Sequence, residues 1–90
     1  MSGGGPPKIE FPCDDYMIKV IGDYQHGFAD RVLALTRAHA PEVDSDKMHV
    51  RYSDKGNFCS VTLWIRATGE PQLKRLHESL RSYARVRMVL

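Results

Sequence analysis

The sequence predicts an α+β fold of two layers, in which two helices cover one side of an antiparallel sheet. Three observations support this expectation. Residues 58–67 alternate between apolar and other side chains without a break, and residues 26–40 repeat apolar side chains at helical spacing. A turn sequence at residues 54–57 separates two strand-like segments, as in a β-hairpin.

The segment Phe58–Ala67 is expected to be a long strand at the centre of the sheet. Successive side chains of a strand point to opposite faces, so one set builds the core and the other meets water or a partner. The set that faces the core is Cys59, Val61, Leu63, Ile65 and Ala67. The opposite set is Phe58, Ser60, Thr62, Trp64 and Arg66.

A strand and a helix are expected before this segment. In the strand, Tyr16–Gly22, the residues Ile18 and Val20 face the core, and the opposite face carries Met17, Lys19 and Ile21. The helix runs from about His26 to Ala40, and its apolar stripe is Phe28, Val32, Leu35 and His39. Pro41 stops it, because the residue before a proline is pushed out of the helical region. In the last turn, an imidazolium at His39 would meet the negative end of the helix dipole.

A second strand, Met48–Ser53, forms the hairpin with the central strand. Its inward side chains are expected to be Met48, Val50 and Tyr52, and its outward ones His49 and Arg51. A second helix starts at Thr68–Pro71, which offers a capping residue, an acid and a proline in the first turn. Its apolar stripe is Leu73, Leu76, Leu80 and Tyr83.

The last strand is expected at Arg85–Leu90, with Val86, Met88 and Leu90 on one face and Arg85, Arg87 and Val89 on the other. The order βαββαβ with right-handed crossovers gives a ferredoxin-like two-layer sandwich with strand order 4-1-3-2 and both helices on one face. Residues 1–10 form a Gly/Pro-rich flexible tail, and residues 11–90 form one domain.

Composition indicates a soluble globular protein. The chain has 90 residues, of which 42% are hydrophobic and 27% charged, and its net charge of +2 is too small to imply nucleic acid by itself. There is no signal peptide and no apolar run long enough to span a bilayer, so cytoplasmic residence is expected. Cys13 and Cys59 are expected to be reduced thiols.

Four patches of the chain resemble the YbeD-like family of small uncharacterised bacterial proteins, sometimes labelled lipoate regulatory. They are FPCDDYMIKVIG at 11–22, RAHAP at 37–41, CSVTLWIRAT at 59–68 and RVRMVL at 85–90. The resemblance implies a ferredoxin-like fold similar to ACT-type regulatory domains, which sense small molecules. It implies no catalytic residue, and nothing in the sequence argues for a link to lipoate.

The side of the sheet without helices is the candidate binding surface. Five of its expected members are cationic and none is acidic, which favours anions. The predicted binding residues are Lys19, Arg51, Trp64, Arg66 and Arg87. Trp64 offers an aromatic plane, and arginine can clasp a carboxylate or a phosphate. The plainer interpretations are a solvated face or a dimer interface anchored by Trp64.

Two other functions are less favoured. An RNA-binding module of this topology stacks bases on exposed aromatics, but Met17, Ser60 and Thr62 stand where aromatics would be expected. A phosphate-binding enzyme of this fold needs an arginine in the loop after the first strand, which here contains Asp23 and no arginine. The four histidines are dispersed, so we expect no metal site and no cofactor.

The sequence therefore predicts a non-enzymatic, cytoplasmic regulatory module. Its open face would bind a small anionic ligand or a protein partner, and the chain would be a monomer or a weak dimer. The alternative is a nucleic-acid-binding module that uses the same face.

Overall fold

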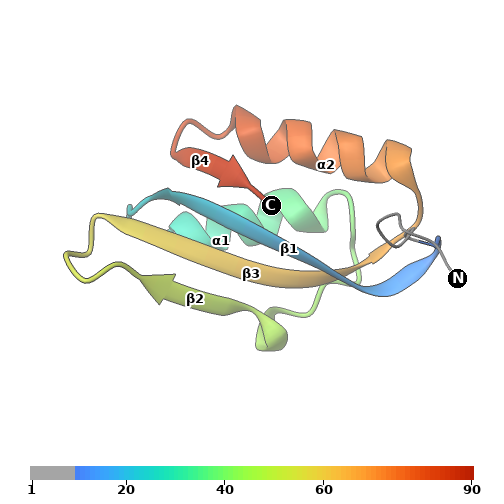
Figure 1. Cartoon of the computed structure of the whole chain (residues 1–90), viewed down its shortest axis with the longest axis horizontal. Helices are drawn as coiled ribbons and strands as arrows, with labels where there is room; N and C mark the ends of the chain where they lie inside the picture. Colours follow the sequence, from blue (N-terminus) through green and yellow to red (C-terminus); the bar gives the residue numbers. More distant parts are fainter. Residues whose placement is uncertain (1–9) are drawn as a thin grey trace, which may run out of the picture.

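The computed structural model describes residues 10–90 and has the predicted order of elements (Figure 1). The strands are β1 (Cys13–Asp23), β2 (His49–Tyr52), β3 (Phe58–Ala67) and β4 (Val86–Val89), and the helices are α1 (Phe28–Arg37) and α2 (Glu70–Ser82), with a short 3-10 turn, η1 (Ser45–Lys47). The strands form one antiparallel sheet in the order β2-β3-β1-β4. This confirms the ferredoxin-like sandwich. The predicted tail lies outside the described residues except for Glu10, which is exposed.

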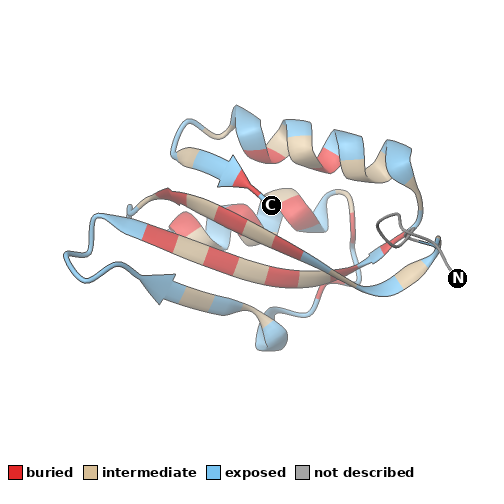
Figure 2. Cartoon of the chain, in the orientation of Figure 1, coloured by how far each residue is buried: buried red, intermediate tan, exposed pale blue. Residues whose placement is uncertain are grey.

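The core is built on one face of β3, as the alternation predicts. Cys59, Val61, Leu63, Ile65 and Ala67 are each at most 3% exposed. Their neighbours on β1, Ile18 and Val20, are completely buried, and Figure 2 shows the same alternation along both strands. Because the two longest strands share one register, the pattern of β3 determines which side chains of β1 face the helices.

Helix α1 is shorter than expected and buries a slightly different stripe. It begins after Gly27, whose φ of 83° is in the left-handed region, and ends at Arg37. Phe28 and Val32 are buried as predicted, and Thr36 is buried as well because its hydroxyl donates to the carbonyl of Val32 at 2.8 Å.

His39 therefore lies beyond the helix, in a turn where the amide of Ala40 donates to the carbonyl of Thr36 at 2.8 Å. The predicted role of His39 at the helix dipole is replaced by a contact between elements. Its Nε2 forms a hydrogen bond of 2.7 Å with the hydroxyl of Ser79 on α2. The side-chain amide of Gln72, also on α2, donates to the carbonyl of His39 at 2.9 Å.

The face assignment of β4 was wrong beyond Val86. Val89 is 8% exposed and belongs to the core, whereas Met88 and Leu90 are 50% and 60% exposed. The reason is a register shift between β1 and β4: Ile21 pairs with Met88 but Gly22 pairs with Val86, so Arg87 is an extra residue. Such a bulge moves the residues after it to the opposite face.

Two further expectations on side chains have mixed outcomes. Tyr52 does not face the core: it is 59% exposed, and its ring meets that of Tyr24 edge to face, with centroids 5.4 Å apart. Both cysteines are free, and burial raises the pKa of the Cys59 thiol, which suppresses its thiolate form.

Between residues 10 and 90, no helix is long and apolar enough to cross a membrane.

Replacing Leu63 with alanine tests the core of β3. Leu63→Ala should lower the free energy of unfolding by ~2–5 kcal/mol, because it leaves a cavity between the sheet and the helices. Thr62→Ala, one residue away on the other face, should cost less than ~1 kcal/mol. Urea unfolding followed by circular dichroism measures both, and a larger loss for Thr62→Ala would show that the faces are reversed.

Replacing Gly22 with alanine tests the close packing of Arg85 and Phe28 against β1. A Cβ on Gly22 would lie 2.4 Å from the carbonyl oxygen of Arg85 and 2.6 Å from the ring of Phe28. Gly22→Ala should therefore cost ~1–3 kcal/mol through overpacking. Gly69→Ala is the matched control, because the nearest atom, in Pro71, lies 3.6 Å away and nothing needs to move. Equal thermal stability of the two variants would contradict this packing.

Candidate functional site

The candidate site is the face of the sheet that no helix covers, called the open face below. The pairing places its side chains in rows that cross the strands, since partners in an antiparallel pair point to the same side. The first row is Met88, Ile21, Ser60 and Arg51. The second is Leu90, Lys19, Thr62 and His49, and the third contains Met17 and Trp64.

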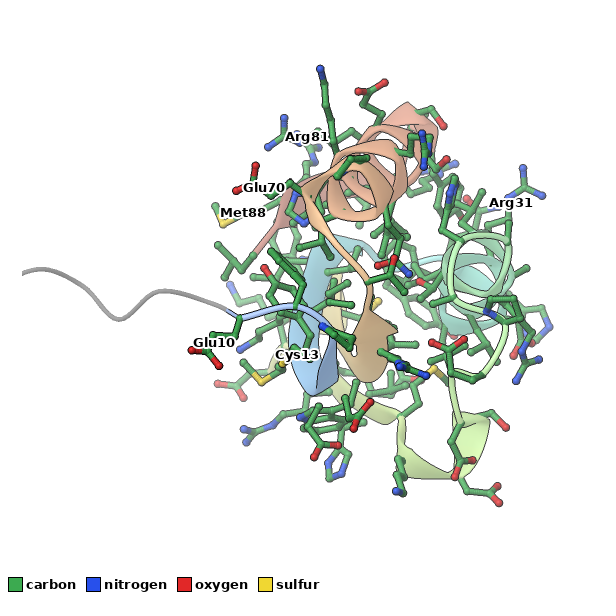
Figure 3. All side chains as sticks on the ribbon, turned by 90° about the vertical axis from the view of Figure 1, so that its right-hand side faces the viewer. Glu10, Cys13, Arg31, Glu70, Arg81 and Met88 are labelled. Atoms are coloured by element: carbon green, nitrogen blue, oxygen red, sulfur yellow. The ribbon has the colours of Figure 1, made fainter. Side chains whose placement is uncertain are left out.

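Large apolar side chains protrude from the open face. Met17, Met88, Leu90 and Phe58 are each between 49% and 60% exposed. In Figure 3 the side chain of Met88 points away from the sheet on the side opposite to Arg31 of α1. Met88 and Leu90 were missed as members of the face, because a period-two pattern cannot show where a bulge interrupts it. They extend the apolar surface across β4, beside Ile21 and Lys19.

Trp64 lies on the open face, as expected, and is partly buried. Its ring packs against the imidazole of His49 on β2, with centroids 5.4 Å apart and an interplanar angle of 73°. On the other side it pairs with Met17 of β1. The contact with His49 holds the indole while leaving part of it accessible.

The four cations among the predicted binding residues differ in whether a carboxylate already pairs with them. Arg87 pairs with Asp23: its Nε donates to the carboxylate at 3.1 and 3.2 Å, and its Nη2 lies 3.0 Å from Oδ2. This hydrogen bonding and the charge of Asp23 raise the pKa of Arg87. The Nε of Arg66 lies 3.4 Å from a carboxylate oxygen of Asp14.

Lys19 and Arg51 are the two members of the predicted set that form no ion pair within residues 10–90. Lys19 stands beside Thr62, and Arg51 stands opposite Ser60 in the adjacent row. They are thus separated by β3, with short polar side chains between them. Together they give the middle of the face a positive charge that nearby carboxylates do not neutralise.

The expectation that no acid reaches the open face was wrong. A hollow of about 460 Å³ beside Trp64 is lined by Asp15, Asp46, Lys47, His49 and Trp64. Asp15 lies within an irregularity in the pairing of β1 between Cys13 and Tyr16, and Asp46 belongs to η1 rather than to a strand. Periodicity could place neither residue. The face is therefore acidic at the Trp64 end and basic from Lys19 to Arg51.

A second hollow, of about 250 Å³, lies between the loop after β1 and the hairpin. Tyr24, His26, Tyr52 and Cys59 are among its lining residues. Asp23, which argued against a phosphate site here, is engaged by Arg87. Arg31 remains unsuited to hold an anion in this loop, since its guanidinium sits 5.9 Å above the ring of Tyr83. Within residues 10–90, no group of three or more histidine, cysteine, aspartate or glutamate residues is arranged so that it could hold a metal ion.

Comparison with solved structures supports the fold. The solution structure of protein HP0495 from H. pylori matches with a TM-score of 0.70 and 17% identity, covering 99% of this chain and 98% of that one. The ACT domain from GTP pyrophosphokinase of Chlorobium tepidum matches with a TM-score of 0.62 and 17% identity, covering 84% of this chain and 96% of that one. The fold is thus of the ACT type, as the resemblance implied.

Comparison of sequences identifies the family. A UPF0250 protein of Pseudomonas paraeruginosa is 53% identical over 85 residues, which are 94% of this chain and 91% of the relative. A UPF0250 protein of Azotobacter vinelandii is 52% identical over 84 residues, 93% of this chain and 91% of the relative. The family model described as "Protein of unknown function (DUF493)" matches residues 6–90. The chain therefore belongs to the DUF493 family, which confirms the YbeD-like resemblance.

Proposed function

We propose that the chain is a non-enzymatic regulatory module of the cytoplasm that binds a partner on its open face. The observation that carries the proposal is the exposure of Met17, Phe58, Met88 and Leu90 on a face that also bears Trp64. Large apolar side chains exposed together on one face mark an interaction site in soluble proteins. The ACT-type fold is consistent with a regulatory role but does not define a ligand.

The residue types suit the binding of a protein surface or a flat ligand. Methionine side chains are flexible and polarisable, so Met17 and Met88 can adapt to a partner. Tryptophan is enriched among the residues that contribute most to binding energy, and Trp64 stands where it can act as an anchor. Burial of this surface would contribute roughly 25 cal/mol per Å² of apolar area before the costs of association.

Charge narrows the chemistry of the partner. Lys19 and Arg51 are the cations of the predicted set that form no ion pair within residues 10–90, so an acidic group on the partner would be recognised there. Arg66 and Arg87 would take part only by exchanging Asp14 and Asp23 for the partner's group. A small anionic metabolite with an apolar body and a protein patch of acidic and apolar residues both fit this arrangement. We favour the protein patch, because Met17, Phe58 and Met88 spread the exposed apolar surface over β1, β3 and β4.

Variants of the open face should lose partners that the native chain retains. The tagged chain is used to capture proteins from an extract of its native cells, followed by mass spectrometry. Trp64→Ala and Lys19→Glu should each remove the specific partner, because they delete the anchor and reverse the central charge. Tyr24→Ala and Arg75→Glu change an aromatic in the loop after β1 and a charge on α2, and should retain it. If Tyr24→Ala and Arg75→Glu lost the partner to the same extent, the binding surface would not be the open face.

The salt dependence of binding separates the proposed partner from nucleic acid. Fluorescence anisotropy with a labelled single-stranded RNA should show no more than weak binding, because the acids around Trp64 disfavour phosphates. A nucleic-acid binder would instead show sub-micromolar affinity that falls steeply between 50 and 200 mM salt through counterion release. That result would favour the nucleic-acid module and overturn the proposed function.

A further inference from the structure

We infer that a second copy of this chain occupies the open face when no other partner is bound. The two sheets would pack face to face, about a twofold axis that crosses the strands along the row Lys19–Thr62–His49. The inference rests on the proposed function, since it names one occupant of the same surface. Three features of the face support it: the sizes of its side chains, the placement of its charges and its area.

Side-chain size is complementary under this symmetry. The axis brings β3 of one copy over β3 of the other in the opposite direction, with Thr62 at the centre. Trp64 and Ser60 lie two residues to either side of Thr62, so each indole would meet the small serine of the other copy. On β1, Met17 and Ile21 flank Lys19 in the same way and would form apolar contacts across the interface.

Charge is complementary as well. The axis exchanges the two ends of the face, so Arg51 of each copy would lie over the η1 turn of the other. That turn carries both Asp46 and Lys47, and both line the hollow beside Trp64. Asp15 of β1 lines it as well, so carboxylates outnumber the lysine at this end. A pair between Arg51 and Asp46 would then occur twice in the dimer, because a twofold interface repeats every contact. An acidic end and a basic end on one face suit such self-pairing better than a uniformly basic face would.

The area of the face implies a weak dimer. Four strands spaced about 4.8 Å apart, with an average length of about 25 Å, give a face on the order of 500 Å² per copy. This is at the low end for specific interfaces. Lys19 would also meet its own counterpart at the axis, and like charges in contact oppose association. A partner with an acidic group opposite Lys19 would therefore displace the second copy, and self-association would regulate access to the face.

Sedimentation equilibrium of the full chain from 10 µM to 1 mM tests the inference. Arg51→Asp and Asp46→Arg should each raise the dimer dissociation constant about tenfold or more, and the double variant should restore it, since the pair is re-formed with reversed charge. Lys19→Met should lower the dissociation constant, because it removes the like-charge contact at the axis. Native circular dichroism and a reversible monomer–dimer equilibrium distinguish this gain from aggregation of a misfolded chain. Arg75→Asp, on the outer surface of α2, is the control and should leave the dissociation constant unchanged.

Two results would overturn the inference. One is a chain that stays monomeric to 1 mM, and the other is a dimer that responds to none of the Arg51, Asp46 and Lys19 variants. Neither result would overturn the proposed function, which depends on capture of a different partner by the same face. The opposite combination is also informative. If the dimer responds to the variants as predicted but Trp64→Ala captures the same proteins as the native chain, the inference is supported and the proposed function is contradicted.

Discussion

Burial of one face of β3 is the constraint on which the rest of the structure depends. Every second residue of β3 from Cys59 to Ala67, five in all, is buried beneath the helices and between the flanking strands. Because a shift of one residue would exchange the faces completely, this burial sets the register of β1 and of the hairpin. It also commits Ser60, Thr62 and Trp64 to the other side of the sheet. The core and the open face are thus two consequences of one pattern.

The regular part of the fold could be predicted from the sequence, and the irregular part could not. Alternation located β3 to the residue, and the shared register gave the inward residues of β1. The bulge opposite Gly22 has no periodic signature, because it depends on how the start of β4 meets the end of β1 in space, where the amide of Asp23 donates to the carbonyl of Arg85. Met88 and Leu90 were consequently placed on the wrong face.

The charged residues of the candidate site also divide into those on regular strands, which the sequence could place, and those that it could not. Lys19 and Arg51 lie on regular strand positions, and their placement on the open face follows from period two. Two of the acids that modify the site come from irregular backbone: Asp15 from a disturbance in β1 and Asp46 from the 3-10 turn. A third, Asp23, ends β1 in register with Phe58. The ion pair of Arg87 joins residues 64 positions apart in the chain. Only the folded backbone brings such groups together, so the sequence predicted a basic face where the structure has a polarised one.

The central claim is that the open face is a surface for association, and Trp64 reports on it directly as the only tryptophan. Acrylamide quenching of its fluorescence should be measured from 1 µM to 1 mM chain. At the lowest concentration we expect red-shifted emission and efficient quenching, with protection as the concentration rises or as a captured partner is added. Blue-shifted emission that resists the quencher at 1 µM, where the chain sediments as a monomer, would show that the open face is not a surface for association.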